Sequence, residues 1–563
     1  MNRPVALDIN HYFDHQELSA ALRSLVQAYP DLAKLHVVAK SHQGREVWLL
    51  EITGRRGGPA ASKPGYYLDA NTHAEELCGS NVALYAAWHL LTHYGQDPEV
   101  TDLLDWQVFY IVPRLDPDGA EICLKEPFYE WIGNGRYLPG DEQFGPGLHY
   151  ADVNGDGVIV DMRIRDDKGE WKISERDPRL MVPREPYEYG GEYYRMIPEG
   201  MIEGFDGSWF DIPRPQDGNL NRNYPYGWGP EGEEYGSGQY PMSEPEIKGA
   251  VEFVLAHPNI VSSLHYHTNA GVLLMPTWVA GEPLPLEDGR LFGRLGEIGE
   301  ALTGYHALTS KDVFHFPGHK PRMGTASAFL YAQVGNLTIG TELWDVFKEA
   351  GIEKDWYFPL RELAEADSLK LLKWNDEQLG GEGFMPWTPF EHPQLGPVEI
   401  GGWKRLFMFR NPPARLLEGI CQRNALFNLR HAAFAPRLRL AEAEALPIAD
   451  GVWKVRATVE NVGYLPTYIT QRALTMKTAQ PVTVELELGP NVELALGAPE
   501  VDLGHLAGRS NRYMAYSRFI DWHADSKKAE WVVRLSGADR GEVVVRAASA
   551  KGGQQEHRIR LTR

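Results

Sequence analysis

The sequence predicts an α/β fold, with a mixed, largely parallel twisted sheet and helices on both faces, followed by an all-β sandwich domain. Up to about residue 375, short and continuously apolar runs alternate with helix-like runs. This alternation is typical of a parallel sheet that helices cover on both sides. After about residue 434, short β-type runs separated by turns replace it, and they indicate a separate sandwich.

The N-terminal part contains the clearest alternation. A helix is expected within 9–35, where Leu18, Leu22 and Leu25 recur at helical spacing together with Val26. Strands, a turn at Gly44 and a second helix follow. The predicted strands span 35–38, 47–52, 65–70 and 108–112, and the predicted helix spans 82–94. A turn is expected at 113–119, which is rich in Pro, Asp and Gly.

The regular pattern breaks between about 127 and 217, where Gly, Pro, Asp and Tyr dominate. We interpret this stretch as a long insertion in the first domain, and 378–402, rich in Gly and Pro, as a surface connection. Between and after them the alternation resumes. The predicted elements are a helix at 243–256, strands at 260–264, 272–276 and 337–341, and helices at 359–375 and 413–431.

We therefore expect two domains, 1–433 with the insertion and 434–563. The predicted sandwich strands include 452–459, 482–488, 531–535 and 543–547. No constellation of histidines and carboxylates appears in the second domain. The sandwich is expected to bind, to stabilise or only to decorate the first domain.

Composition excludes several classes of protein. The formal net charge of −21 argues against nucleic acid or an anionic membrane as a partner. No run of about twenty apolar residues exists, so we expect no membrane span. Residues 1–8 lack the apolar core of a signal peptide, and we expect a cytoplasmic protein, or a secreted or periplasmic one if a signal has been removed. Cys78, Cys123 and Cys421 form no disulfide framework. The oligomeric state stays open.

His73 and Glu76 follow the predicted strand at 65–70 and precede a predicted helix. The carboxyl ends of parallel strands are where open α/β sheets bind ligands. A histidine and a carboxylate at this spacing can coordinate one Zn²⁺ when another part of the chain supplies a third ligand and one position stays open for water. The alternative is a satisfied loop histidine beside a solvated glutamate.

A second motif lies inside the insertion. Oxygen side chains recur at alternate positions from Asp152, and Gly157 occupies the sixth position, as in the first half of an EF-hand-type loop. The twelfth position is Arg163, so the usual closing carboxylate is missing. The candidate calcium ligands are Asp152, Asn154, Asp156 and Asp161. The alternative is an Asx-rich turn that satisfies its own backbone.

Five motifs occur in a fixed order. They are His73-x-x-Glu76, Pro113-x-x-Asp116-Pro117-Asp118-Gly119, Leu220-Asn221-Arg222-Asn223-Tyr224, His267-Thr268 nine residues before Pro276, and Thr341-Glu342-Leu343. In this order and at predicted strand ends, they resemble the zinc carboxypeptidase (M14) family. The resemblance covers roughly 9–375, with weaker support to 433.

The resemblance implies one zinc per chain, held by His73, Glu76 and His267. His267 is preferred over His265 because the nine-residue step to Pro276 fits the family without a gap. His265 points to the same face one step deeper in the strand, where a core role is expected.

The resemblance also implies the catalytic and substrate-binding residues. Glu342 matches the general base, and Asn221 and Arg222 match the pair that holds the C-terminal carboxylate of the substrate. The family uses a further arginine to polarise the scissile carbonyl, and the insertion obscures its position. Arg136 is the first candidate and Arg163 the second.

Three departures from the family pattern stand out. Asp116 replaces the usual Asn, which we expect to alter a loop rather than the chemistry. Lys320 lies eleven residues before Tyr331, where the family has its pocket tyrosine, and it is a candidate donor to the substrate carboxylate. Ser327 falls where the side-chain pocket is often located, and no specificity is predicted from it.

The expected activity is zinc-dependent removal of C-terminal residues from peptides. Zinc brings bound water to a pKa near ~7, and a carboxylate relays its proton to the leaving amine. A cation near the carbonyl stabilises the oxyanion, and an Arg fork matches a terminal carboxylate. Two alternatives stay open: a relative acting on a specialised amide, such as a cell-wall peptide or a side-chain conjugate, and a zinc-retaining binding protein without turnover.

Overall fold

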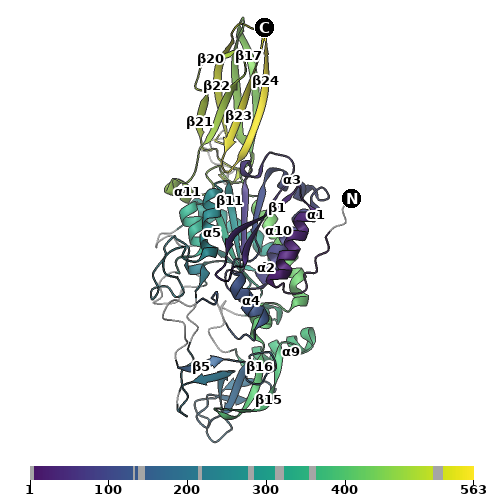
Figure 1. Cartoon of the computed structure of the whole chain (residues 1–563), viewed down its shortest axis with the longest axis vertical. Coiled ribbons are helices and arrows are strands. Elements are labelled where there is room, and N and C mark those ends of the chain that lie inside the picture. Colours follow the sequence, from purple (N-terminus) through teal and green to yellow (C-terminus); the bar gives the residue numbers. More distant parts are fainter. Residues whose placement is uncertain are drawn as a thin grey trace.

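The computed structural model describes residues 5–130, 133–136, 146–208, 210–213, 218–276, 284–310, 313, 322–353, 363–511 and 524–563. Three β assemblies follow one another along the long axis of the molecule (Figure 1). An eight-stranded sheet with its helices lies in the middle, a pair of four-stranded sheets at the top, and a six-stranded sheet at the bottom. Within the described ranges, every helix is too short or too polar to cross a lipid bilayer.

The central sheet is mixed, and its four middle strands run parallel. In spatial order its strands are β1 (Ala33–Lys40), β2 (Glu46–Thr53), β4 (Val108–Val112), β3 (Gly65–Ala70), β11 (Ile260–Thr268), β14 (Leu337–Leu343), β12 (Val272–Met275) and β13 (His306–Thr309). β4, β3, β11 and β14 pair in parallel, whereas β1, β2 and β12 join antiparallel. The parallel strands end at one shared edge, which we call the carboxyl edge.

Helices cover both faces of this sheet because successive side chains of each strand point to opposite sides. On one face, Tyr66 and Leu68 belong to a core shared with α1, α2, α3, α6 and α10. On the other, Tyr67 and Tyr110 pack with α5. The helices are α1 (His15–Ala28), α2 (Cys78–His93), α3 (Pro98–Trp106), α5 (Pro245–Ala256), α6 (Leu286–Thr303) and α10 (Leu417–Ala432). The predicted α/β architecture is confirmed.

Further helices connect these elements. They are α4 (Pro117–Lys125), α8 (Val346–Glu349), α9 (Glu365–Leu379), α11 (Gln471–Met476), η1 (Ala60–Ser62), η2 (Leu220–Arg222), η3 (Ala328–Val334), η4 (Arg405–Arg410), η5 (Ala414–Leu416) and η6 (Arg509–Asn511). The turn predicted at 113–119 runs into α4, because the side chain of Asp116 caps its first turn by accepting from the Gly119 amide at 2.9 Å. α6 and β13 lie where the sequence predicts no element.

The insertion and a later hairpin form one sheet. Its strands, in spatial order, are β15 (Phe384–His392), β16 (Gly396–Trp403), β6 (Asp161–Arg165), β9 (Tyr194–Pro198), β7 (Trp171–Ile173) and β8 (Met181–Pro183). β5 (Gly147–Tyr150) pairs with β10 (Gly200–Glu203) beside it. The prediction of a surface connection at 378–402 is therefore wrong. Val398 and Ile400 bury against Met162, and the prolines of β15 are tolerated on an edge strand.

The C-terminal strands form the predicted β-sandwich. One sheet contains β17 (Leu438–Ala449), β18 (Val452–Asn461), β22 (Ser526–Leu535) and β20 (Val492–Leu496), and the other contains β21 (Glu500–Gly504), β19 (Val482–Leu488), β23 (Arg540–Ser549) and β24 (Gly553–Thr562). Val455 and Trp531 of the first sheet share one buried core with Val484 and Val545 of the second. Two sheets closing on one core are the sandwich arrangement.

The sandwich contacts the central sheet at its amino edge, where the parallel strands begin. Lys551, in the turn between β23 and β24, donates to the carbonyl of Ile260 at 2.6 Å and to Oδ1 of Asn336 at 2.7 Å. These residues stand at the starts of β11 and β14. The six-stranded sheet lies on the opposite side of the central sheet, beyond the carboxyl edge (Figure 1).

Candidate metal centre

The loop after β3 carries two of the predicted ligands. Asn71 adopts a left-handed conformation with φ of 55°, which turns the chain sharply at the end of the strand. Its side-chain amide donates to the carbonyls of His73 and Ala74 at 2.7 and 3.2 Å. Its Oδ1 accepts from Arg114 Nε at 3.1 Å. This buried amide therefore holds the loop in one shape before α2 begins.

Two neighbouring strands supply the third predicted ligand and the predicted base. β11 and β14 run parallel, and their register places His267 beside Glu342. Both side chains point to the face opposite Tyr266, because side chains alternate along a strand. The apolar pattern of the two strands thus brings the imidazole and the carboxylate together at the carboxyl edge.

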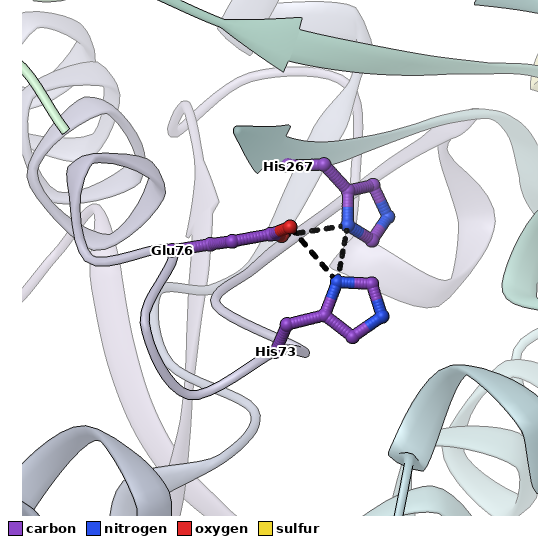
Figure 2. Close-up of side chains that lie close together, drawn as sticks. All are labelled: His73, Glu76 and His267. Atoms are coloured by element: carbon purple, nitrogen blue, oxygen red, sulfur yellow. Dashed lines mark hydrogen bonds and ion pairs between the residues drawn. The ribbon is translucent and has the colours of Figure 1, made fainter. Parts of the chain in front are cut away.

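The three ligand side chains converge on one point (Figure 2). His73 Nδ1 lies 3.0 Å from Glu76 Oε1, and His267 Nδ1 lies 2.9 Å from Glu76 Oε2. The two Nδ1 atoms are 3.3 Å apart. Two imidazole nitrogens and a carboxylate are a donor set that suits Zn²⁺. His73, Glu76 and His267 therefore fit a zinc ion.

The electrostatics of the site favour an ionised Glu76. Burial opposes its ionisation, but the imidazoles of His73 and His267 lower the pKa of Glu76 to about 2. Its carboxylate is therefore available as a metal ligand.

Glu342 lies in a different environment. Its side chain is 6% exposed, and Oε2 has no hydrogen-bond partner among the described residues. Burial and then the charge of Glu76 raise the pKa of Glu342 to about 8, against the influence of His267, Arg410 and Arg322. A buried carboxylate with a raised pKa beside a metal-ligand set has the properties of a proton-transfer group.

Asn221 and Arg222, the predicted substrate-binding pair, lie on η2. Arg222 is 6% exposed, and its Nη1 donates to the carbonyl of Asn221 at 2.6 Å. Its Nε lies 3.6 Å from Oε2 of Glu234. Burial and the charge of Arg322 lower the pKa of Arg222 to about 10, and the charge of Arg222 in turn acts on His73. The guanidinium is therefore close to the metal ligands.

His265 occupies the core position expected for it. It is 1% exposed, its Nδ1 lies 2.7 Å from Oδ1 of Asp69, and its Nε2 lies 3.2 Å from Thr338. Asp69 is its register partner on β3. Both ring nitrogens are thus occupied by neighbouring strands.

The structure does not bring the two candidate arginines to the triad. Arg136 Nη1 lies 3.0 Å from both carboxylate oxygens of Glu244 and 2.7 Å from His42 Nε2. Arg163 pairs with Glu399 at 2.8 Å, within the six-stranded sheet. Lys320 lies outside the described residues. Ser327 directly precedes η3.

The prediction of calcium is not supported. Oδ1 of Asp152 accepts from the amides of Gly155 and Asp156, and its Oδ2 accepts from that of Gly157. The side chains of Asn154 and Asp156 accept further amides of the same turn. Asp161 accepts from Tyr129 and Arg405 outside the turn. These side-chain oxygens accept hydrogen bonds from the protein itself, as in the alternative of an Asx-rich turn.

Arg410 is a residue of the site that the motifs did not reveal. It closes η4, and its Nε and Nη2 lie 3.9 Å from Glu75 and 3.2 Å from Glu130. The next residue, Asn411, donates to the Glu75 carbonyl at 2.7 Å and accepts from the Cys78 amide at 2.9 Å. This segment therefore braces the loop of His73 and Glu76. It follows β16 and lies far beyond Glu342, so no local signal marks it.

Comparison with known families agrees with this geometry. The family model described as zinc carboxypeptidase matches residues 18–143 and 153–348, more than half of the chain. The chain belongs to the zinc carboxypeptidase (M14) family. A second model, a domain of unknown function (DUF8731), matches 437–560.

Curated relatives of this zinc carboxypeptidase family member match over short stretches. Carboxypeptidase M of Mus musculus is 33% identical over 24% of this chain and 30% of its own length. Zinc carboxypeptidase of Saccharothrix mutabilis subsp. capreolus is 30% identical over 22% and 28%. Inactive metallocarboxypeptidase ecm14 of Schizosaccharomyces pombe is 30% identical over 24% and 28%. The chain thus spans less than a third of the length of each of these relatives.

Solved structures give weaker likenesses. Thrombin activatable fibrinolysis inhibitor matches with a TM-score of 0.45 at 14% identity, over 75% of this chain and 74% of that chain. Carboxypeptidase A from Helicoverpa armigera matches with 0.42 at 16% identity, over 68% and 75%. At these TM-scores the likeness carries no argument.

Proposed function

We propose that this protein is a zinc-dependent metallocarboxypeptidase that hydrolyses the C-terminal peptide bond of peptides. The observation that carries the proposal is the buried carboxylate of Glu342, in register with His267 and without a partner for Oε2 among the described residues. A purely structural metal site has no use for an unsatisfied carboxylate beside its ligands, whereas hydrolysis needs a base there.

In this proposal, His73, Glu76 and His267 would hold a zinc ion, which when bound would supply an activated water and polarise the carbonyl. Glu342 accepts a proton from the attacking water and returns it to the leaving amine. Burial supports this role, because its raised pKa lies close to neutral pH.

Arg222 and Asn221 would bind the free carboxylate at the C-terminus of the substrate. A guanidinium matches a carboxylate bidentately, and Arg222 is fixed by its bond to the Asn221 carbonyl. This arrangement selects the chain end without reading a side chain.

Arg410 is our candidate for the cation that stabilises the developing oxyanion. Its charge acts on both Glu76 and Glu342, which places it within electrostatic reach of the reacting groups. Among the described residues, the one hydrogen bond of its Nη1 is a 3.5 Å contact to Asn269, two residues after His267. This leaves one arm of the guanidinium weakly bound on the side of the ligands.

The test combines metal content with hydrolysis of blocked dipeptides that carry free or amidated C-termini. We expect zinc in the triad, cleavage of free C-termini only, and loss of that selectivity in Arg222→Gln. Equal cleavage of amides would reject the role of Arg222, and absence of triad zinc after metal-free handling would reject the ligand assignment.

A second candidate function is hydrolysis of a specialised amide. The six-stranded sheet, which lies beyond the carboxyl edge, favours this candidate. Arg405 on η4 pairs with Asp161 of that sheet at 3.3 Å, and this pair joins the sheet to the segment of Arg410. Bound zinc without cleavage of either dipeptide set, followed by cleavage of a branched or cell-wall amide, would select this candidate. No turnover of any amide would indicate a binding protein.

A further inference from the structure

A second cluster of metal-ligating side chains lies apart from the triad. His42 belongs to the turn between β1 and β2, and Glu244 and Glu246 stand at the start of α5. One ligand atom of each lies within 4.8 Å of the others, and His42 Nε2 is 2.9 Å from Glu244 Oε2. The two glutamates are buried.

Glu246 is the unexplained member of this cluster. It is 0% exposed, and neither carboxylate oxygen has a hydrogen-bond partner among the described side chains and backbone. Burial, together with the charges of Glu244 and Asp118, raises its pKa to about 7, against the influence of its own backbone amide and of His42. A carboxylate in this position is favourable when ionised only if a cation joins it.

Arg136 is the present counter-ion, but its contacts do not complete the cluster. Nη1 faces both oxygens of Glu244 and Nε2 of His42, and it has only two hydrogens for three acceptors. His42 Nε2 meets a donor, Arg136, and an acceptor, Glu244, although a ring nitrogen serves as one or the other. Glu246 receives no bond from the guanidinium.

The other neighbours satisfy only Glu244. Ser243 Oγ donates to its Oε1 at 3.0 Å, and Asn134 Nδ2 donates to its Oε2 at 3.2 Å. Asp118 is already paired with Arg45 at 2.6 Å. Among the described residues, these contacts leave Glu246 facing His42 and Glu244 without a positive partner of its own.

We propose that His42, Glu244 and Glu246 form a second divalent-cation site, which binds a zinc-type d-block ion in place of the Arg136 guanidinium. One imidazole and two carboxylates suit Zn²⁺ or Mn²⁺, whereas Ca²⁺ and Mg²⁺ prefer oxygen ligands alone. The side chain of Arg136 is 31% exposed, so it has solvent into which to withdraw.

The site is linked to the substrate-binding loop. The backbone amide of Glu244 donates to Oδ1 of Asn223 at 3.0 Å, and Asn223 follows Arg222. Asn223 Nδ2 in turn donates to the carbonyls of Ser237 and Tyr240. A cation at His42, Glu244 and Glu246 therefore fixes the start of α5 and, through Asn223, the chain next to Arg222.

The test is metal stoichiometry and Zn²⁺ affinity of the full chain, measured by calorimetry and elemental analysis. We expect two zinc ions in the wild type and one in Glu246→Gln and in His42→Ala. Glu252→Gln is the matched control, because Glu252 is an exposed carboxylate on the same helix, and it should retain two. In His267→Ala, which lacks a triad ligand, Zn²⁺ should still raise the Tm, and Glu246→Gln in that background should remove the rise.

Arg136→Gln supplies an independent measurement. Removal of the competing guanidinium should lower the Kd for Zn²⁺ in the His267→Ala background at least tenfold. One zinc in the wild type and none in His267→Ala would overturn the second site without affecting the proposed function. A second zinc that persists in Glu246→Gln and His42→Ala would also overturn it.

Discussion

Two buried ionisable side chains stand at opposite ends of the central sheet and differ in how they are satisfied. Lys551, from the sandwich, is 6% exposed and donates to Ile260 and Asn336 where β11 and β14 begin. Glu342, where β14 ends, is equally buried, yet its Oε2 has no partner among the described residues. The same two strands therefore carry a satisfied group at one end and an unsatisfied one at the other.

This difference separates stability from function within one sheet. Lys551 at the amino edge completes its bonds inside the protein, so its removal should change folding. In the proposed function, Glu342 at the carboxyl edge transfers a proton, so its removal should change chemistry. The other two β assemblies also lie at opposite edges of the central sheet. The sandwich contacts the amino edge, and the six-stranded sheet lies beyond the carboxyl edge.

The largest effect is expected for Glu342→Gln. Loss of the base should lower kcat by about 10²- to 10⁴-fold, because the amide cannot accept the proton. Zinc content and Tm should stay close to those of the wild type, since the exchange removes no hydrogen bond of Oε2. Steady-state kinetics with elemental analysis measure both. Activity that survives the exchange would remove Glu342 from the proposed mechanism.

The next effect concerns Arg410→Gln. If the guanidinium stabilises the oxyanion, kcat should fall by about 10²- to 10³-fold with little change in KM. Arg405→Gln is the matched control on η4, because Arg405 is bound to Asp161 in the other sheet. A larger loss in Arg405→Gln than in Arg410→Gln, or a loss of zinc in Arg410→Gln, would indicate that η4 acts only as a brace.

At the amino edge, Lys551→Ala should lower stability without changing catalysis. Two buried acceptors lose their donor, at about 1–3 kcal/mol each, so the free energy of unfolding should fall by about 2–6 kcal/mol. Thermal denaturation measures the fall, and kcat/KM per folded molecule should be unchanged. Lys528→Ala, at an exposed position of β22, is the control. A changed KM in Lys551→Ala would mean that the two edges are coupled.

The stability of the protein should also depend on pH. Burial lowers the pKa of Lys551 to about 7, whereas an unfolded lysine titrates near ~10.4. Between these values the unfolded chain binds more protons than the folded one, so the free energy of unfolding rises with pH from about 7 to 10. Denaturant titrations at several pH values should show a smaller rise in Lys551→Met. An equal rise would assign the effect to other groups.

Much of the site was predictable because its motifs resemble those of the zinc carboxypeptidase family and follow predicted strand ends. His73, Glu76, His267 and Glu342 stand where apolar runs stop, and these runs are visible in the sequence. Arg410 was not predictable, since it reaches the loop of Glu75 through a segment that no motif connects to it. Arg136 was a candidate for the cation near the scissile carbonyl, but in the structure it contacts Glu244 and His42.

The same reasoning explains the errors in the fold. The hairpin at 384–403 has a Gly- and Pro-rich sequence typical of a loop, but β6 of the insertion supplies the partner that makes it a strand pair. Local composition cannot report a partner more than two hundred residues away. The turn at Asp152 shows the opposite case, in which local backbone acceptors account for oxygens that resembled a metal loop.

By itself, the sequence determined the α/β class and the sandwich, because apolar periodicity depends on nearby residues alone. It indicated the triad and its neighbouring carboxylate through motifs that resemble those of the zinc carboxypeptidase family. Only the tertiary structure decided which charges meet. It placed Arg410 beside the loop of His73 and Glu76, Lys551 at the starts of β11 and β14, and Arg136 between His42 and Glu244. Ion pairs join residues far apart in the chain, and their formation depends on packing that no local pattern records.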